Sequence, residues 1–278
     1  MTETEGRSFP AATWRLILDG EADGPTNMAL DDAILEAVGA EASPPTLRFY
    51  GWSPPCLTLG RSQPQAEADL EACRAAGVHV VRRPSGGQAI LHTDELTYSI
   101  ALRQTDPRAE GGVLEVYRLL SDGLLLGLNR LGVGAVSAAG KADAGVKTPI
   151  CFETPSAYEI VANGLKLVGS AQWRARGAVL QHGTLPLQGD LGRIVHYLSF
   201  PETEREEQAR RLLARATTLE AVLGCRLPFD QVADALAAGL AQVLNVTLAP
   251  GSFSAGEQAR AAELRRTRYT DPEWTARR

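Results

Sequence analysis

The feature that most constrains the fold is the stretch from Arg82 to His92, which joins two apolar segments. It reads Arg-Arg-Pro-Ser-Gly-Gly-Gln-Ala-Ile-Leu-His, and the apolar segment Val78–Val81 leads into it. A glycine pair lets a backbone approach a ligand where a Cβ would clash. Neighbouring arginines offer rigid forks of donors that suit phosphate or carboxylate. The stretch therefore predicts either a loop that holds an anionic, acyl-bearing ligand or a plain hairpin turn with solvated arginines.

Hydrophobic periodicity predicts mixed helices and strands before Pro201 and helices after it. Asn163-Gly164 is a strong two-residue hairpin signal between apolar runs, and it places Lys166 on a strand. Capping-box patterns begin at Thr217 and Ser254. We predict an α/β fold in which residues 12–200 form a mixed β-sheet flanked by helices, followed by a helical C-terminal extension over residues 201–278. The expected helices are 27–38, 67–76, 114–131 and 228–243, the expected strands are 14–18, 46–50, 56–59, 78–81, 95–103, 158–162 and 165–168, and residues 138–147 are expected to form a mobile loop.

The composition is that of an ordinary globular protein. The 278 residues are 44% hydrophobic and 22% charged, with a net charge of −5, which argues against a general nucleic-acid binder. The N-terminal segment lacks a signal-peptide pattern and no apolar run could span a bilayer, so we expect a cytoplasmic protein without a membrane partner. Four widely spaced cysteines and four histidines show no disulfide framework and no metal-ligand spacing, so no metal is expected.

Cys151 differs from the other cysteines because prolines surround it. Residues 149–155 read Pro-Ile-Cys-Phe-Glu-Thr-Pro, which indicates a rigid, non-helical segment. The other three cysteines fit small buried hydrophobic residues. From the residues alone, Cys151 is either structural or a nucleophile. Lys166, one of only three lysines in the chain, is either a solvated strand residue or a functional cation.

Three ordered motifs resemble the biotin/lipoate ligase and acyltransferase superfamily. They are Arg-Arg-x-Ser-Gly-Gly at 82–87, Lys-x-x-Gly-Ser-Ala at 166–171 and His-Gly-Thr at 182–184, while Asn-Met-Ala-Leu-Asp-Asp-Ala at 27–33 is similar to the first helix of that family. The resemblance covers nearly the whole chain and implies a biotin/lipoate ligase-like catalytic domain. Cys-Phe-Glu-x-Pro-Ser-x-Tyr-Glu at 151–159 resembles the nucleophile segment of the LipM-type octanoyltransferases. Ligases do not normally carry a cysteine there, and they often have a third glycine where this chain has Gln88.

The resemblance implies a protein N-octanoyltransferase of lipoate biosynthesis. It would move an octanoyl group from octanoyl-acyl carrier protein to a lysine of a lipoyl-accepting protein, such as the glycine cleavage H protein. Cys151 would carry the acyl group as a thioester, and Lys166 would either hold the thiol ionised or assist the oxyanion and the incoming amine. Neither ATP nor another cofactor is expected, and we expect a monomer. The residues implied to contact the substrate are Arg82, Ser85, Gly86, Gly87, His92, Gly169, Ser170, Ala171, His182 and Gly183.

The sequence leaves several alternatives open. His92 and His182 are each either a general base or a residue that orients a loop by hydrogen bonds; we favour the second because Lys166 already supplies a cation. An ATP-dependent lipoate-protein ligase would use Arg82, Lys166 and the glycine loop on a phosphate, and Cys151 is the residue that argues against it. An amidotransferase acting between protein lysines would use the same thiol chemistry. A non-catalytic protein that sequesters a lipoyl or octanoyl group is the alternative outside enzymes.

Overall fold

The computed structural model describes residues 8–138, 148–153 and 159–277. The predicted loop over 138–147 therefore lies outside the described residues except for its first position, as do residues 154–158 of the Cys151 segment. The larger sheet is mixed, as predicted, because β1 pairs in parallel with both of its neighbours while the remaining pairs are antiparallel. Its strands, in spatial order, are β11 (Val246–Pro250), β1 (Ala12–Ala22), β2 (Thr46–Trp52), β6 (Glu95–Arg103), β10 (Ala178–Pro186), β9 (Leu165–Ala175), β8 (Glu159–Ala162) and β7 (Val136–Ala138).

A smaller sheet carries the glycine loop predicted from the sequence. Its order is β4 (His79–Arg82), β3 (Cys56–Leu59), β5 (Ile90–His92), so residues 83–89 connect its two outer strands. Because β3 pairs in parallel with β4 and antiparallel with β5, the loop turns back across one end of β3. The loop is thereby fixed at both ends by strands.

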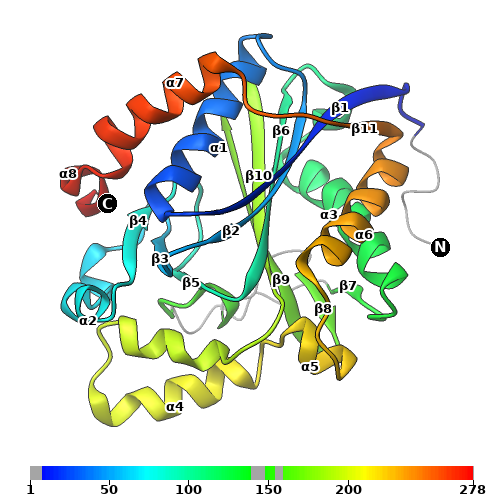
Figure 1. Cartoon of the computed structure of the whole chain (residues 1–278). Coiled ribbons are helices and arrows are strands. Elements are labelled where there is room, and N and C mark those ends of the chain that lie inside the picture. The colour runs from blue at the N-terminus through cyan, green and yellow to red at the C-terminus, as the bar shows by residue number, and fades with distance from the viewer. Residues whose placement is uncertain (1–7, 139–147, 154–158, 278) are drawn as a thin grey trace.

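Helices cover both faces of the larger sheet (Figure 1). On one face lie α1 (Gly24–Gly39) and α7 (Ala255–Leu264), and on the other α3 (Val113–Arg130) and α6 (Phe229–Leu244) pack on one another. The strand predicted over 95–103 has its apolar positions toward α3 and α6, but it is buried on both faces rather than one. Its second face carries Thr97 and Ser99, whose hydroxyls have buried partners, so a polar residue there does not mean exposure. The remaining helices are η1 (Gln65–Glu67), α2 (Leu70–Ala75), η2 (Pro107–Ala109), η3 (Cys151–Glu153), η4 (Leu191–Tyr197), α4 (Glu202–Leu213), α5 (Leu219–Leu223), the π-helix η5 (Arg265–Tyr269) and α8 (Pro272–Ala276).

The C-terminal extension is mostly helical, as predicted, but it also contributes a strand. The capping box predicted at Ser254 is present, whereas the N-cap of α5 is Thr218, one residue after the predicted Thr217. Strand β11 adds to the edge of the larger sheet next to β1, in a stretch where only helices were expected. The boundary predicted at residue 200 stays a prediction. No helix in the described part of the chain is long and apolar enough to cross a membrane.

Candidate active site

A cavity, called here the central cavity, is enclosed by the two sheets, the glycine loop and α1. Eight of the ten predicted substrate contacts line it, together with Cys151 and Arg83. Arg82 and Ser85 do not line it, and neither does Lys166. The full lining is Met28, Tyr50, Trp52, Thr58, Arg83, Gly86, Gly87, Ile90, His92, Thr97, Cys151, Gly169, Ser170, Ala171, His182, Gly183 and Thr184.

Cys151 is half-buried and its thiol lies beside the glycine loop. Its N–H donates to the carbonyl of Ala89 at 3.0 Å, and the N–H of Ala89 donates to Pro149 at 2.9 Å. This pairing holds η3 so close to the loop that a Cβ placed on Gly87 would lie 3.9 Å from the Cys151 sulfur. Pro149 thus belongs to a segment that is held against the loop, and Cys151 begins the short helix η3, although the prolines around it in the sequence predicted a non-helical segment.

The other three cysteines lie in different environments. Cys56 and Cys73 are buried, and burial raises the pKa of each thiol, that of Cys73 to about 11. Cys225 is exposed, and none of the three lines the central cavity. Cys151 is therefore the cysteine that lines the central cavity.

Lys166 is buried next to Cys151, not solvated. Its ammonium donates to the carbonyl of Cys151 at 3.1 Å and pairs with Glu159 at 2.8 Å. The backbone of Lys166 is fixed as well, because its N–H donates to Arg215 and its carbonyl accepts from Thr217. Burial by itself would lower the pKa of Lys166, but the negative charges of Cys151 and Glu159 raise it above the ordinary lysine value. The side chain is thus an ammonium at neutral pH.

The glycine loop wraps around the buried guanidinium of Arg83. This group donates to the carbonyls of Gly86 at 2.9 Å and Gln88 at 2.7 Å, and to both oxygens of Thr58. Gly87 adopts a positive φ of 94°, which a side chain would strain. Among the described residues, the N–H groups of Gly86, Gly87 and Gln88 donate to no other protein group. Three adjacent backbone donors of the loop are therefore available, and one of them belongs to Gly87, the residue that approaches the Cys151 sulfur.

Arg82 was predicted to contact the substrate, but it does not line the central cavity. Its guanidinium donates to the carbonyls of Gly60 and Gln63, each at 2.6 Å, and twice to that of Thr275. The indole of Trp274 in turn donates to the Arg82 carbonyl at 2.9 Å. Arg82 therefore ties the start of the loop to α8, and its neighbour Arg83 contacts the central cavity.

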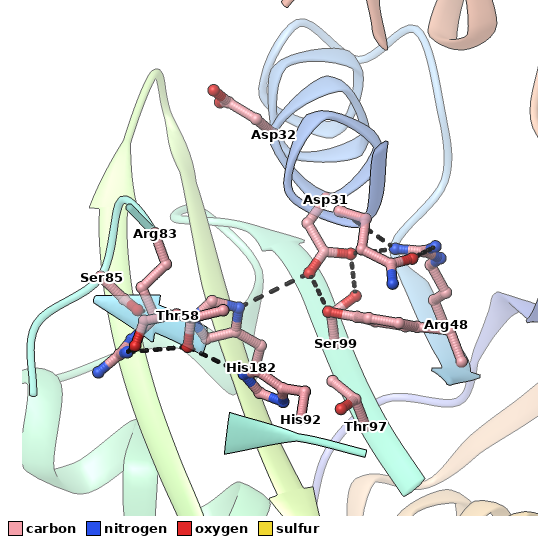
Figure 2. Close-up of polar contacts among 12 residues, drawn as sticks. Asp31, Asp32, Arg48, Thr58, Arg83, Ser85, His92, Thr97, Ser99 and His182 are labelled. Atoms are coloured by element: carbon pink, nitrogen blue, oxygen red, sulfur yellow. Dashed lines mark hydrogen bonds and ion pairs between the residues drawn. The ribbon is translucent and has the colours of Figure 1, made fainter. Parts of the chain in front are cut away.

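His182 links the glycine loop to α1 through a buried carboxylate (Figure 2). The hydroxyl of Ser85 lies 2.6 Å from His182 Nε2, and the other ring nitrogen lies 3.6 Å from Asp31. Asp31 also accepts from Arg48 and from Ser99, each at 2.8 Å. Burial by itself would raise the pKa of Asp31, but His182, Arg48 and Ser99 lower it, so Asp31 is ionised. Ser85 thus contacts His182, which lines the central cavity, and does not line the cavity itself.

His92 also lines the central cavity and is fixed by three neighbours. Its Nε2 lies 2.9 Å from the hydroxyl of Thr58, and its Nδ1 contacts Glu95. The ring stacks on Trp52 with 4.0 Å between ring centroids. These contacts hold the ring in place, and the prediction that His92 and His182 orient loops rather than act as general bases stays a prediction. Within the described ranges, no group of three or more His, Cys, Asp and Glu side chains is arranged to hold a metal ion.

Comparison with known proteins identifies the family of the chain. Residues 23–241 match the model of the lipoyl protein ligase A/B catalytic domain. The octanoyltransferase LipM of Symbiobacterium thermophilum is 42% identical over 272 residues, covering 95% of this chain and 98% of the relative. The octanoyltransferase LipM of Bacillus subtilis is 36% identical over 274 residues, covering 96% and 99%.

Two solved structures share the fold at lower identity. A bipartite lipoate protein ligase from Thermoplasma acidophilum superposes with a TM-score of 0.79 at 23% identity, covering 95% of this chain and 96% of that one. Lipoate-protein ligase A bound with ATP gives a TM-score of 0.77 at 23% identity, covering 95% and 98%. At this identity the match concerns the fold alone, whereas the family model and the full-length relatives concern the sequence itself. The chain therefore belongs to the family of the lipoyl protein ligase A/B catalytic domain.

Proposed function

We propose that the protein is an octanoyltransferase of lipoate biosynthesis that works through a Cys151 thioester. The donor would be octanoyl-acyl carrier protein, and the acceptor a lysine of a lipoyl-accepting protein. The observation that carries this proposal is the position of Cys151, the cysteine that lines the central cavity and lies next to the Lys166 ammonium. The names of full-length relatives at 36–42% identity support the octanoyl group as the cargo.

In the first half-reaction the Cys151 thiolate attacks the carbonyl carbon of the donor thioester. A bond forms between the Cys151 sulfur and that carbon, the carrier's carbon–sulfur bond breaks, and the carrier leaves as a thiolate that takes up a proton. The N–H groups of Gly86, Gly87 and Gln88 are candidates for binding the oxyanion of the tetrahedral intermediate, because nothing else in the described chain uses them. One thioester replaces another, so the step needs no ATP and no cofactor.

Lys166 has a role in each half-reaction in this proposal. In the free enzyme its ammonium favours the Cys151 thiolate, since an adjacent cation stabilises an anion. Once Cys151 is acylated, its negative charge is gone. One of the causes that raise the pKa of Lys166 is then lost, while burial still lowers that pKa. The pKa of Lys166 then falls, which favours a neutral amine able to accept a proton, while the Glu159 carboxylate 2.8 Å away opposes this change.

In the second half-reaction the ε-amine of the acceptor lysine attacks the acyl-enzyme. An amide bond forms, the bond from the acyl carbon to the Cys151 sulfur breaks, and the proton lost by the amine passes to Lys166. The amide is more stable than the thioester, so the transfer runs downhill. Because the acyl group rests on Cys151 between the steps, the two protein substrates need not bind together.

Intact-mass spectrometry after mixing with octanoyl-acyl carrier protein, without ATP, tests the proposal. We expect an octanoyl adduct on the unmodified protein and on Cys225→Ala, the matched cysteine control, but none on Cys151→Ala. Labelling that requires free octanoate with ATP and survives in Cys151→Ala would instead identify a ligase. An adduct formed only from an octanoylated acceptor protein would identify an amidotransferase.

A further inference from the structure

The floor of the central cavity includes a row of four residues that face one another across four strands. Gly169 on β9 pairs with Thr184 on β10, Thr184 pairs with Thr97 on β6, and Thr97 pairs with Tyr50 on β2. All four line the central cavity, which therefore runs across the strands. We call these residues the cross-strand row.

One end of the cross-strand row is the thiol end. A Cβ on Gly169 would meet the ring of Phe152 at 3.4 Å, and Phe152 follows Cys151 in η3. The other end is formed by Tyr50 and Trp52 of β2 and by Met28 of α1. An acyl chain held on the Cys151 sulfur and extended along the row would point its last carbons at these three side chains.

The length of the row matches a medium-length acyl chain. Three steps between strands of about 4.8 Å each span about 14 Å. Van der Waals contact at the far wall takes about 4 Å of this distance. The remaining length of about 10 Å is close to the roughly 9 Å of an extended eight-carbon chain, which has seven carbon–carbon bonds of about 1.5 Å in zigzag.

The three side chains at the far end differ in how firmly they are held. The indole of Trp52 donates to Thr97 at 2.8 Å and stacks on His92, and the hydroxyl of Tyr50 donates to Asp31 at 2.8 Å. Met28 is held by apolar packing alone, in a cluster that includes residues of α7 and η5. A methionine side chain is flexible and fills irregular gaps. Met28 is therefore the adjustable part of a rigid wall.

We propose that Met28 and Trp52 set the length of the acyl group that the protein accepts, with Met28 as the side chain whose size decides it. This inference rests on the proposed function for the identity of the acyl group, and on the cross-strand row for its length. Met28→Ala lengthens the cavity and admits longer chains. Met28→Phe, whose rigid ring fills the same end, favours shorter ones.

The closing experiment measures length preference by binding, without any reaction. Thermal stabilisation by hexanoic, octanoic, decanoic and dodecanoic acids is compared in the Cys151→Ala background for Met28→Ala, Met28→Phe and Leu35→Ala. Leu35 is equally buried on α1 but does not line the central cavity, so it controls for the loss of core volume. We expect an optimum at eight carbons in the parent and in Leu35→Ala. In Met28→Ala the affinity ratio of decanoic to octanoic acid should rise about tenfold, since two methylenes gain burial.

A parallel measurement separates this inference from the proposed function. Adduct formation from octanoyl-acyl carrier protein is followed in the variants that retain Cys151. An unchanged length optimum in both Met28 variants, or the same shift in Leu35→Ala, overturns the role of Met28 even when the unmodified protein forms its adduct. A shifted optimum in a protein that forms no adduct supports the length role and overturns the transferase.

Discussion

Replacing Lys166 by methionine tests both the stability and the chemistry of the candidate site. The substitution keeps an unbranched side chain of similar length but removes the ammonium that pairs with Glu159 and lies against Cys151. Glu159 then keeps a carboxylate whose side chain is only 12% exposed. Removing one partner of a buried pair costs about 3–5 kcal/mol. We expect the lower end, about 3 kcal/mol, because Glu159 still reaches some solvent.

The pH dependence of this loss follows from the raised pKa of Lys166. A group whose pKa is higher in the folded state stabilises the fold fully when the pH is below its pKa in the unfolded state, here near 10.5. This stabilisation is lost as the pH rises through the pKa of the group in the folded state. The difference between wild type and Lys166→Met in urea unfolding should therefore be constant from pH 6 to pH 9 and decline only above that range.

The chemical consequence is measured as alkylation of Cys151 by iodoacetamide, in a Cys225→Ser background that removes the exposed thiol. Because an adjacent cation stabilises a thiolate, its loss should slow alkylation at pH 7 by about tenfold. The double variant with Glu159→Gln should recover most of the stability but not the alkylation rate. An unchanged alkylation rate in Lys166→Met would refute the electrostatic role, whatever happens to stability.

Three further substitutions probe the supports of the site. Asp31→Asn removes the carboxylate that pairs with buried Arg48 and should lower the free energy of unfolding in urea at pH 7 by about 3 kcal/mol. Because the pKa of Asp31 is lowered in the folded state, this difference should shrink as the pH falls below 3.8. Gly239→Ala places a Cβ 2.3 Å from the carbonyl of Gly123 where α3 meets α6, and should lower the unfolding free energy by about 1–3 kcal/mol in a thermal scan. Trp274→Phe removes the hydrogen bond to the Arg82 carbonyl, costs about 1 kcal/mol, and should speed amide exchange in the glycine loop.

Features set by neighbours in the chain were predictable from the sequence. The hairpin at Asn163-Gly164 is present with φ of 52° and 79°, because these two residues tolerate the left-handed region that a tight hairpin turn needs. It places Lys166 on a strand, as predicted. The alternation of β6 likewise identified the face that packs on α3 and α6. In each case the residues that determine the local structure lie within one short stretch of the chain.

Features that depend on which way a side chain faces were not predictable in the same way. Arg82 and Arg83 are adjacent and alike in chemistry, and neighbouring residues at a strand end point in different directions. The sequence does not say which one faces the cavity until the partners of both, such as Gly60 and Thr275, are placed in space. Asp31 and Glu159 were missed as partners of His182 and Lys166 for the same reason, since no local pattern marks a partner on another element.

The C-terminal extension supports both halves of the candidate site. Lys166 is anchored through its backbone to Arg215 and Thr217, and the start of the glycine loop is anchored through Arg82 to Thr275. A unit ending at residue 200 would contain every proposed catalytic residue but none of these anchors. Arg82 would then keep a buried guanidinium with fewer acceptors, which costs more than the hydrogen bonds themselves. The geometry that brings Cys151, Lys166 and the loop together is therefore a property of the chain from β1 to α8.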